Sequence, residues 1–129
     1  MTDLILSNAR LIDPDTDYDG PGALRISDGM IDDVAKGAEP AAPEGATIID
    51  CDGKPLAPGI VDMRVSVGEP GERHKESYRS VGRAAAAGGV TTIAVQPDTD
   101  PAVDDPAVME FAMRRAEAAS VVRVAPMAA

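Results

Sequence analysis

Hydrophobic positions in the first half of the chain form short segments, and turn residues separate these segments. Such short segments between turns predict β-strands, here beginning at Leu4 and covering residues 23–27, 30–35 and 47–49. Asp28-Gly29 tolerates the positive φ angles of a two-residue hairpin turn, and residues 37–45 form a loop rich in glycine, proline and acid. We therefore expect a small antiparallel β domain over residues 1–56.

After Pro58 the pattern changes. Longer apolar runs, typical of strands, now alternate along the chain with segments that have a helical pattern. The expected elements are strands over residues 60–67, 90–95 and 121–125 and helices over residues 75–87 and 106–119. Asp105-Pro106 supplies an N-cap and a first-turn proline, and Gly88-Gly89 ends the earlier helix. The order β-α-β-α-β is typical of a parallel sheet with right-handed crossovers.

The third of these strands comes at the end of the sequence, with no helix after it. A parallel sheet is stable when helices cover both faces or when it closes into a barrel, and a barrel of eight β/α units takes roughly 250 residues. We therefore expect residues 57–129 to be an incomplete α/β domain in a piece of a longer protein. A self-contained domain with three parallel strands is the alternative.

Composition narrows the class of protein. The chain has 12 basic and 22 acidic side chains, a net charge of −10, and this argues against binding nucleic acid or an anionic membrane. Cys51 is the only cysteine, so the chain contains no disulfide framework and no cysteine-based zinc site. The first residues include an early acid and no long apolar run, unlike a signal peptide or a membrane span. We expect a cytoplasmic protein.

Two segments carry candidate chemistry that the surrounding pattern does not support. Asp15 to Gly20 reads D-x-D-x-D-G, like the start of a calcium loop, but Ile26 stands where the bidentate glutamate belongs. An acidic surface turn is the expected structure. His74 lies between two cations, a poor metal-binding arrangement, and we expect it to cap or orient the helix that follows.

The segment VDMRVSVGEPG (residues 61–71) has the position of an active-site strand, because it is apolar and enclosed by Pro58-Gly59 and Pro70-Gly71. Alternate residues of a strand point the same way, so the side chains of Arg64 and Ser66 share one face. Neither is a good catalyst. The segment therefore has the place of an active site without its expected chemistry.

Five blocks in sequence order carry a family likeness: DLILSNARLID, DGKPLAPGIVDM, EPGERHKES, RAAAAGGVTTIAV and QPDTDPAVDDP. Together they resemble the N-terminal third of a dihydroorotase, in the cyclic-amidohydrolase group that also contains allantoinases and dihydropyrimidinases. The resemblance implies a metal-dependent (β/α)8 TIM barrel, with a small β domain built from both ends of the chain. Residues 57–129 are then the first β/α units of that barrel.

The resemblance also implies a site. The family's first barrel strand ends in H-x-H-x-R, two histidines that bind zinc and an arginine that holds the substrate carboxylate. Arg64, Ser66 and Gly68 stand at those positions. After the second strand the family reads P-N-T, with an asparagine that binds substrate, and Asp98 replaces it here.

These replacements remove the chemistry that the family needs. The guanidinium of Arg64 offers only donors and cannot ligate zinc, and a serine such as Ser66 is a poor ligand. Gly68 lacks the cation that would pair with a carboxylate, and Asp98 would repel one. We therefore expect this chain to supply no catalytic residue, no substrate-binding residue and no zinc ligand.

Degenerate chains of this kind resemble the inactive dihydroorotase homologues that assemble with aspartate carbamoyltransferase in pyrimidine biosynthesis. The resemblance therefore implies a pseudoenzyme that acts as a scaffold in an oligomeric assembly. Two other classes stay open. One is a working cyclic amidohydrolase with altered ligands or substrate, and the other is a small stand-alone binding module.

Arg64 itself has two interpretations. Its guanidinium could occupy the former metal position and neutralise acidic ligands from later strands, because a buried charge needs such partners. Alternatively, it points along the barrel mouth into water.

Overall fold

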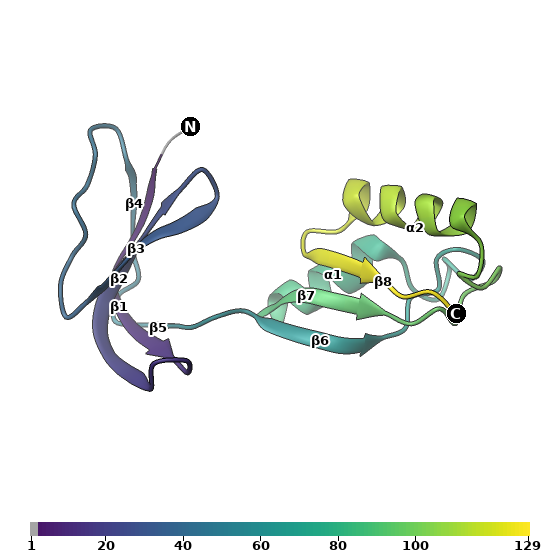
Figure 1. Ribbon diagram of the computed structural model, residues 1–129, viewed down its shortest axis with the longest axis horizontal. Coiled ribbons are helices and arrows are strands. Elements are labelled where there is room, and N and C mark those ends of the chain that lie inside the picture. The colour runs from purple at the N-terminus through teal and green to yellow at the C-terminus, as the bar shows by residue number, and fades with distance from the viewer. Residues whose placement is uncertain (1–2) are drawn as a thin grey trace. The chain divides into compact units, whose positions relative to one another are not determined.

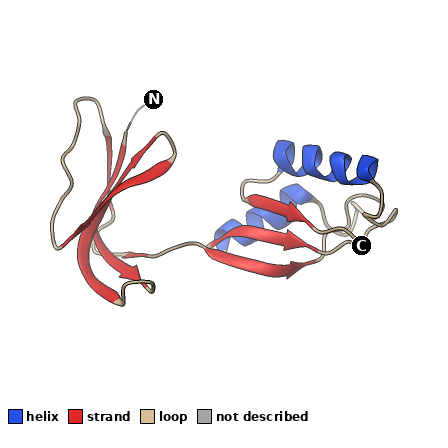
Figure 2. Ribbon diagram, in the orientation of Figure 1, coloured by secondary structure: helices blue, strands red, loops and turns tan. Residues whose placement is uncertain are grey.

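The computed structural model describes residues 3–129, which form two compact units, the chain up to Pro58 and Gly59–Ala129 (Figure 1). The division falls between Pro58 and Gly59, whereas the sequence pattern puts the domain boundary between residues 56 and 57. The first unit is built from strands alone, and the second combines strands with helices (Figure 2).

The first unit is one five-stranded sheet. Its strands are β1 (Leu4–Asp13), β2 (Tyr18–Ser27), β3 (Met30–Lys36), β4 (Thr47–Asp50) and β5 (Pro55–Leu56), in the order β3-β2-β1-β4, with β5 also pairing with β1. Asp28 and Gly29 connect β2 to β3 with φ angles of 50° and 78°. The predicted hairpin turn is therefore confirmed.

The expectation that this β domain is antiparallel is wrong, because the sheet is mixed. Strands β4 and β5 both run parallel to β1, while the pairs β1–β2 and β2–β3 are antiparallel. Strand β4 enters beside the start of β1, where the Thr47 N–H donates to the Asp3 carbonyl at 2.8 Å. The loop before β4 is long enough to cross to the far edge of β1, and local turn signals do not reveal such a crossover.

The second unit has the predicted β-α-β-α-β order. Its elements are β6 (Ile60–Val65), α1 (Tyr78–Ala87), β7 (Val90–Val95), α2 (Pro106–Ala119) and β8 (Arg123–Pro126). The three strands pair in the order β6-β7-β8 and all run parallel, as predicted. The predicted bounds of three elements are wrong. Strand β6 ends at Val65 and not at Val67, α1 begins at Tyr78 and not at Lys75, and β8 covers Arg123–Pro126 and not residues 121–125.

One apolar layer lies between this sheet and both helices. Its buried members come from the strands, from the segment after β6 and from both helices: Val67, Tyr78, Ile93, Val95, Ala112 and Ala116. Ile93 and Val95 are alternate residues of β7 and therefore face the same side of the sheet. Because α1 and α2 both pack into this layer, they cover one and the same face of the sheet.

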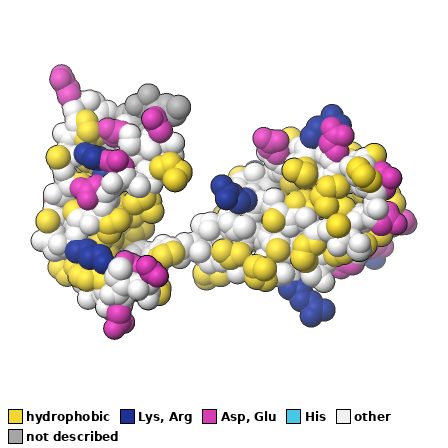
Figure 3. All heavy atoms as spheres, in the orientation of Figure 1, with side chains coloured by type: hydrophobic (Ala, Val, Ile, Leu, Met, Phe, Trp, Pro, Cys, Tyr) yellow, Lys and Arg dark blue, Asp and Glu magenta, His cyan; other side chains and the backbone are white. Residues whose placement is uncertain are grey.

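The surface carries several large apolar side chains. On the first unit they lie on the two edge strands, with Met30 and Ile31 on β3 and Ile48 and Ile49 on β4 all exposed, and Figure 3 shows a broad apolar area on this unit. Among residues 3–129, no helix is both long enough and apolar enough to cross a membrane.

Candidate functional site at the carboxyl ends of β6 and β7

The structure brings two of the four sequence-predicted positions into direct contact. Ser66 follows the last residue of β6, and Asp98 lies in the loop that follows β7. Because the strands are parallel, their carboxyl ends lie at the same edge of the sheet. The Ser66 hydroxyl donates a hydrogen bond to Asp98 Oδ2 at 2.6 Å. Both side chains are exposed, so this pair lies on the surface at the edge of the sheet.

Arg64 lies on the same strand, close to this pair. Its neighbours Val65 and Val67 contribute to the apolar layer under the helices, so the side chains of Arg64 and Ser66 point to the opposite side. The Arg64 N–H donates to Asp62 Oδ1 at 3.0 Å, where the pairing of β6 with β7 shifts register. Within residues 3–129 the guanidinium has no hydrogen-bond or ion-pair partner. Among the described residues, nothing prevents the Arg64 guanidinium from pointing into water. Its pairing with acidic side chains from later strands stays a hypothesis.

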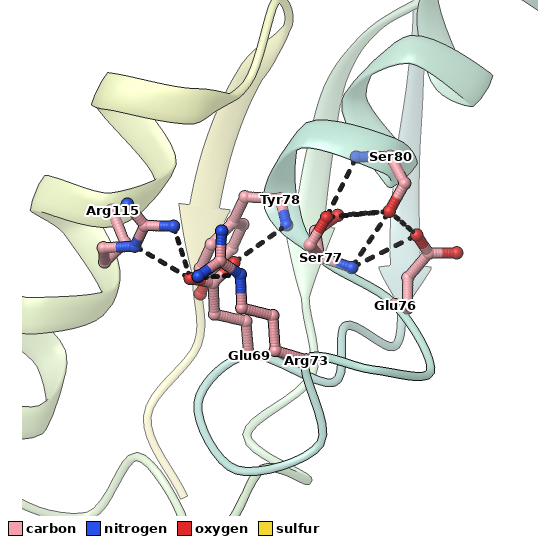
Figure 4. Close-up of polar contacts among 7 residues, drawn as sticks. All are labelled: Glu69, Arg73, Glu76, Ser77, Tyr78, Ser80 and Arg115. Atoms are coloured by element: carbon pink, nitrogen blue, oxygen red, sulfur yellow. Dashed lines mark hydrogen bonds and ion pairs between the residues drawn. The ribbon is translucent and has the colours of Figure 1, made fainter.

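Gly68 lies near the start of the loop that leads from β6 to α1, and Glu69 anchors this loop (Figure 4). Glu69 is 3% exposed, and among residues 3–129 it is the one charged residue that is buried. Its Oε1 accepts a hydrogen bond from Arg115 Nε at 2.8 Å and lies 2.7 Å from Arg115 Nη2, while Oε2 accepts from the Tyr78 N–H at 3.3 Å. The Nε of Arg73 lies 3.8 Å from Oε1. One carboxylate therefore ties the loop to the first residue of α1 and to the middle of α2.

Positive charge surrounds the buried Glu69 carboxylate. Two guanidinium groups face the carboxylate, and the unpaired N–H groups at the start of a helix carry partial positive charge. The negative charge also acts on its neighbour. Burial, together with the charge of Glu69, raises the pKa of the Tyr78 hydroxyl above its ordinary value.

The sequence reasoning missed Glu69, although the sequence holds a signal for it. Arg115 lies on the same helical face as Ala112, Ala116 and Ala119, which pack into the apolar layer. A guanidinium on a buried face needs an acidic partner, because an unpaired charge in such a place is very unfavourable. The signal predicts that a partner exists, but not that this partner lies in the loop after β6.

The start of α1 is fixed by serines and not by histidine. Ser77 is the N-cap, and its hydroxyl accepts from the Ser80 N–H at 3.2 Å, while the Ser80 hydroxyl accepts from the Ser77 N–H at 3.0 Å. The Ser80 hydroxyl also donates to Glu76 Oε1 (Figure 4). His74 is exposed and lies before this cap. Of the two roles expected for His74, capping the helix is therefore wrong, and orienting it stays a prediction.

The calcium-like segment begins in the predicted exposed turn between β1 and β2, and its last three residues, 18–20, belong to β2. Asp15 and Asp17 point to the surface, whereas Asp19 binds Nε and Nη2 of Arg10 at 2.6 and 2.5 Å. The hydrogen bond from Arg10 lowers the pKa of Asp19. One of the three carboxylates of the motif is thus already paired with a cation.

The donor set at the carboxyl ends of β6 and β7 does not fit a zinc ion. Arg64 has no lone pair to give, and the Ser66 hydroxyl is directed at Asp98. Over residues 3–129, no group of three or more His, Cys, Asp or Glu side chains comes together in a way that could hold a metal ion.

Comparison with known proteins identifies the family. The sequence model described as "Dihydro-orotase-like" matches residues 53–129, which is more than half of the chain. The chain belongs to the dihydroorotase-like family. This confirms the resemblance inferred from the sequence blocks.

Curated relatives match over nearly the whole chain. This chain is 40% identical over 126 residues to the dihydroorotase of Syntrophus aciditrophicus, and the alignment covers 98% of this chain and 29% of that relative. It is 36% identical over 124 residues to the dihydroorotase of Citrifermentans bemidjiense, covering 96% of the chain and 29% of the relative. The chain thus spans less than a third of the length of these relatives.

Solved structures show the same fold. The L-hydantoinase (dihydropyrimidinase) from Arthrobacter aurescens superposes with a TM-score of 0.81 at 26% identity, over 98% of this chain and 27% of that one. A D-hydantoinase superposes with a TM-score of 0.76 at 23% identity, over 97% of this chain and 26% of that one. The fold of both units is therefore one that occurs within much longer cyclic amidohydrolases.

Proposed function

We propose that this chain is the N-terminal part of a non-catalytic dihydroorotase-like protein of pyrimidine biosynthesis, which acts in the cytoplasm as a scaffold subunit for aspartate carbamoyltransferase. The observation that carries the proposal is the hydrogen bond between Ser66 and Asp98. It joins a position at which the family resemblance expects a zinc ligand to one at which it expects a substrate ligand. The Ser66 hydroxyl hydrogen is directed at Asp98, and neither replacement is of the residue type that the family's chemistry uses.

The loss of metal binding follows from the residue types. Changing a residue that only supports a metal ligand typically lowers affinity or activity by about 10–100-fold, and losing a ligand itself has a larger effect. Two ligand positions are replaced here, by Arg64 and Ser66. The cation of Arg64 also repels a divalent ion placed beside it. Without the metal, water at this site keeps its ordinary pKa and is a weak nucleophile.

The loss of substrate binding is a separate argument. An anionic substrate needs a cation, and Gly68 offers no side chain where the resemblance expects an arginine. Asp98 adds a negative charge at a position where the resemblance expects a neutral amide, and the Ser66 hydroxyl fixes this carboxylate beside the end of β6. Compared with the family pattern, position 68 has thus lost a cation and position 98 has gained an anion.

We also propose that the second unit is the beginning of a TIM barrel. Helices α1 and α2 cover the same face of the sheet, as they do when successive right-handed crossovers wind around a barrel. The superposition on hydantoinases, in which this chain covers 27% of the longer protein, supports the same architecture.

The scaffold role is tested by binding. Sedimentation velocity of the full-length protein mixed with aspartate carbamoyltransferase should give one faster-sedimenting complex. The double variant Ser66→Ala/Asp98→Ala should form the same complex, because a scaffold does not need these side chains. Separate sedimentation of the two proteins at micromolar concentrations would exclude this partner.

Hydrolysis of a cyclic amide with altered ligands is the second candidate function. Its support is the 26% identity to an L-hydantoinase over nearly the whole chain. In that case the metal ligands come from parts of the protein outside this sequence. Metal content and turnover separate the two candidates.

A further inference from the structure

Gly68 lies where a side chain has no room. A Cβ atom added to Gly68 would lie 2.4 Å from the Glu72 carbonyl oxygen, 2.9 Å from the Glu72 carbonyl carbon and 3.1 Å from the Glu76 carbonyl oxygen. All three atoms belong to the backbone, so no side-chain rotation relieves the contact. Even alanine at position 68 requires the loop to move.

The requirement for glycine here is one of space and not of backbone conformation. The φ angle of Gly68 lies outside the positive range that disfavours other residues, in contrast to Gly71 in the same loop at 94°. An L-residue could therefore adopt the backbone of Gly68 without strain. What excludes it is the loop lying in the place of its side chain.

The loop that fills this place is held from several sides. The Glu72 carbonyl accepts from the Lys75 N–H at 2.8 Å, which closes a turn above Gly68. Glu69 fastens the loop to α1 and α2, as described above. Gly71 touches the loop after β7, because a Cβ there would lie 2.2 Å from the Asp100 carbonyl oxygen. Displacing the Glu72 carbonyl therefore disturbs a connected set of contacts.

We propose that Gly68 is a positioning residue, which allows the segment 68–77 to adopt its conformation. The backbone of this segment then leaves no room at position 68 for an anion-binding side chain. The inference rests on the proposed function, since it explains why the proposed loss of substrate binding is fixed in the backbone. In this loop conformation, an arginine at position 68 would displace the Glu72 carbonyl before it restored a cation at that position.

Hydrogen exchange on the wild-type full-length protein gives the first test, because it needs no variant. The amides of Lys75 and Tyr78 donate to Glu72 and Glu69, so they should exchange roughly tenfold or more slowly than the exposed amide of His74. Equal exchange of these three amides, after correction for intrinsic rates, would show an unseated loop and would overturn the proposal.

The second test compares two glycines of the same unit. A Cβ at Gly88 would have its nearest contacts at 3.5 and 3.7 Å, an ordinary van der Waals distance, and its φ is −90°. Gly68→Ala should lower the thermal midpoint by several degrees and speed exchange at Lys75 and Tyr78 by about tenfold, whereas Gly88→Ala should not lower the midpoint and should leave the exchange at these amides unchanged. A Gly68→Ala protein that behaves like the Gly88→Ala protein would overturn the proposal.

These results are independent of the proposed function. Dihydroorotate turnover by the wild type would contradict the proposed function, yet would not change the exchange rates or the comparison of the two glycines. If Gly68→Ala fails to fold while Gly88→Ala folds, the exchange pattern of the wild type decides.

Discussion

Two carboxylates in this protein make nearly the same ion pair in opposite surroundings. In the second unit Arg115 Nη2 lies 2.7 Å from Glu69, whose side chain is 4% exposed. In the first unit Arg10 Nη2 lies 2.5 Å from Asp19, whose side chain is 52% exposed. The distances are alike, so burial decides what each pair contributes. Removing one partner of a buried pair leaves a charge without solvent, whereas an exposed charge regains water.

The largest effect is expected at the buried pair. Glu69→Gln leaves Arg115 without its counter-charge and weakens the acceptor for the Tyr78 N–H. Losing hydrogen bonds to a charged group typically lowers the free energy of unfolding by about 1.5–3 kcal/mol, and the 33% exposed side chain of Arg115 keeps the loss below that of a fully buried pair. Urea unfolding of the full-length protein, followed by circular dichroism, measures this loss.

The matched control is Glu117→Gln, which removes the same charge from an exposed position of α2. It should change the free energy of unfolding by no more than about 0.5 kcal/mol. If both variants unfold at the same urea concentration, burial does not distinguish Glu69 and the comparison fails.

A smaller effect is expected at the start of α1, which the same loop positions. Ser77→Ala removes the acceptor for the Ser80 N–H and should lower the free energy of unfolding by about 1 kcal/mol. Ser77→Asp keeps an acceptor at the N-cap and should lie close to the wild type. The same urea titration separates the two variants. Equal losses in both would mean that the cap is not the origin of the effect.

The smallest effect is expected at the exposed pair, and it should depend on pH. The hydrogen bond from Arg10 lowers the pKa of Asp19 below that of the unfolded chain. The ionised Asp19 therefore stabilises the fold above its unfolded pKa of about 4, and this contribution disappears as the pH falls through the lower folded value.

Asp19→Asn should accordingly flatten the acid side of the thermal midpoint against pH and leave the effect of Glu69→Gln unchanged. Adding salt should reduce the difference between Asp19→Asn and the wild type at neutral pH. A larger loss from Asp19→Asn than from Glu69→Gln would reverse the comparison.

Local signals predict much of the fold but not the first unit's sheet order. Helix α2 has the predicted bounds because Asp105 and Pro106 define its first turn within adjacent residues. The parallel pairing of β4 with β1 was missed, since the long loop of residues 37–45 precedes β4 and no short turn connects β4 to its partner β1. The start of α1 was set too early, because the polar residues before Ser77 also suit a helix.

The candidate site was predictable in position but not in contacts. Alternation along β6 and the family resemblance single out Arg64, Ser66 and Asp98 from the sequence. The hydrogen bond between Ser66 and Asp98 joins residues far apart in the chain and depends on the register of two parallel strands. The clash that excludes a side chain at Gly68 depends on loop backbone geometry, which no pattern of residue types encodes.

The proposed loss of zinc binding and catalysis is tested most directly by the zinc content and dihydroorotate turnover of the full-length protein, measured on one preparation after incubation with zinc and dialysis. A dihydroorotase that retains the family's histidines is the positive control. For a non-catalytic protein, we predict zinc far below one equivalent at this site and no turnover above the uncatalysed rate. One equivalent of zinc together with turnover would contradict it.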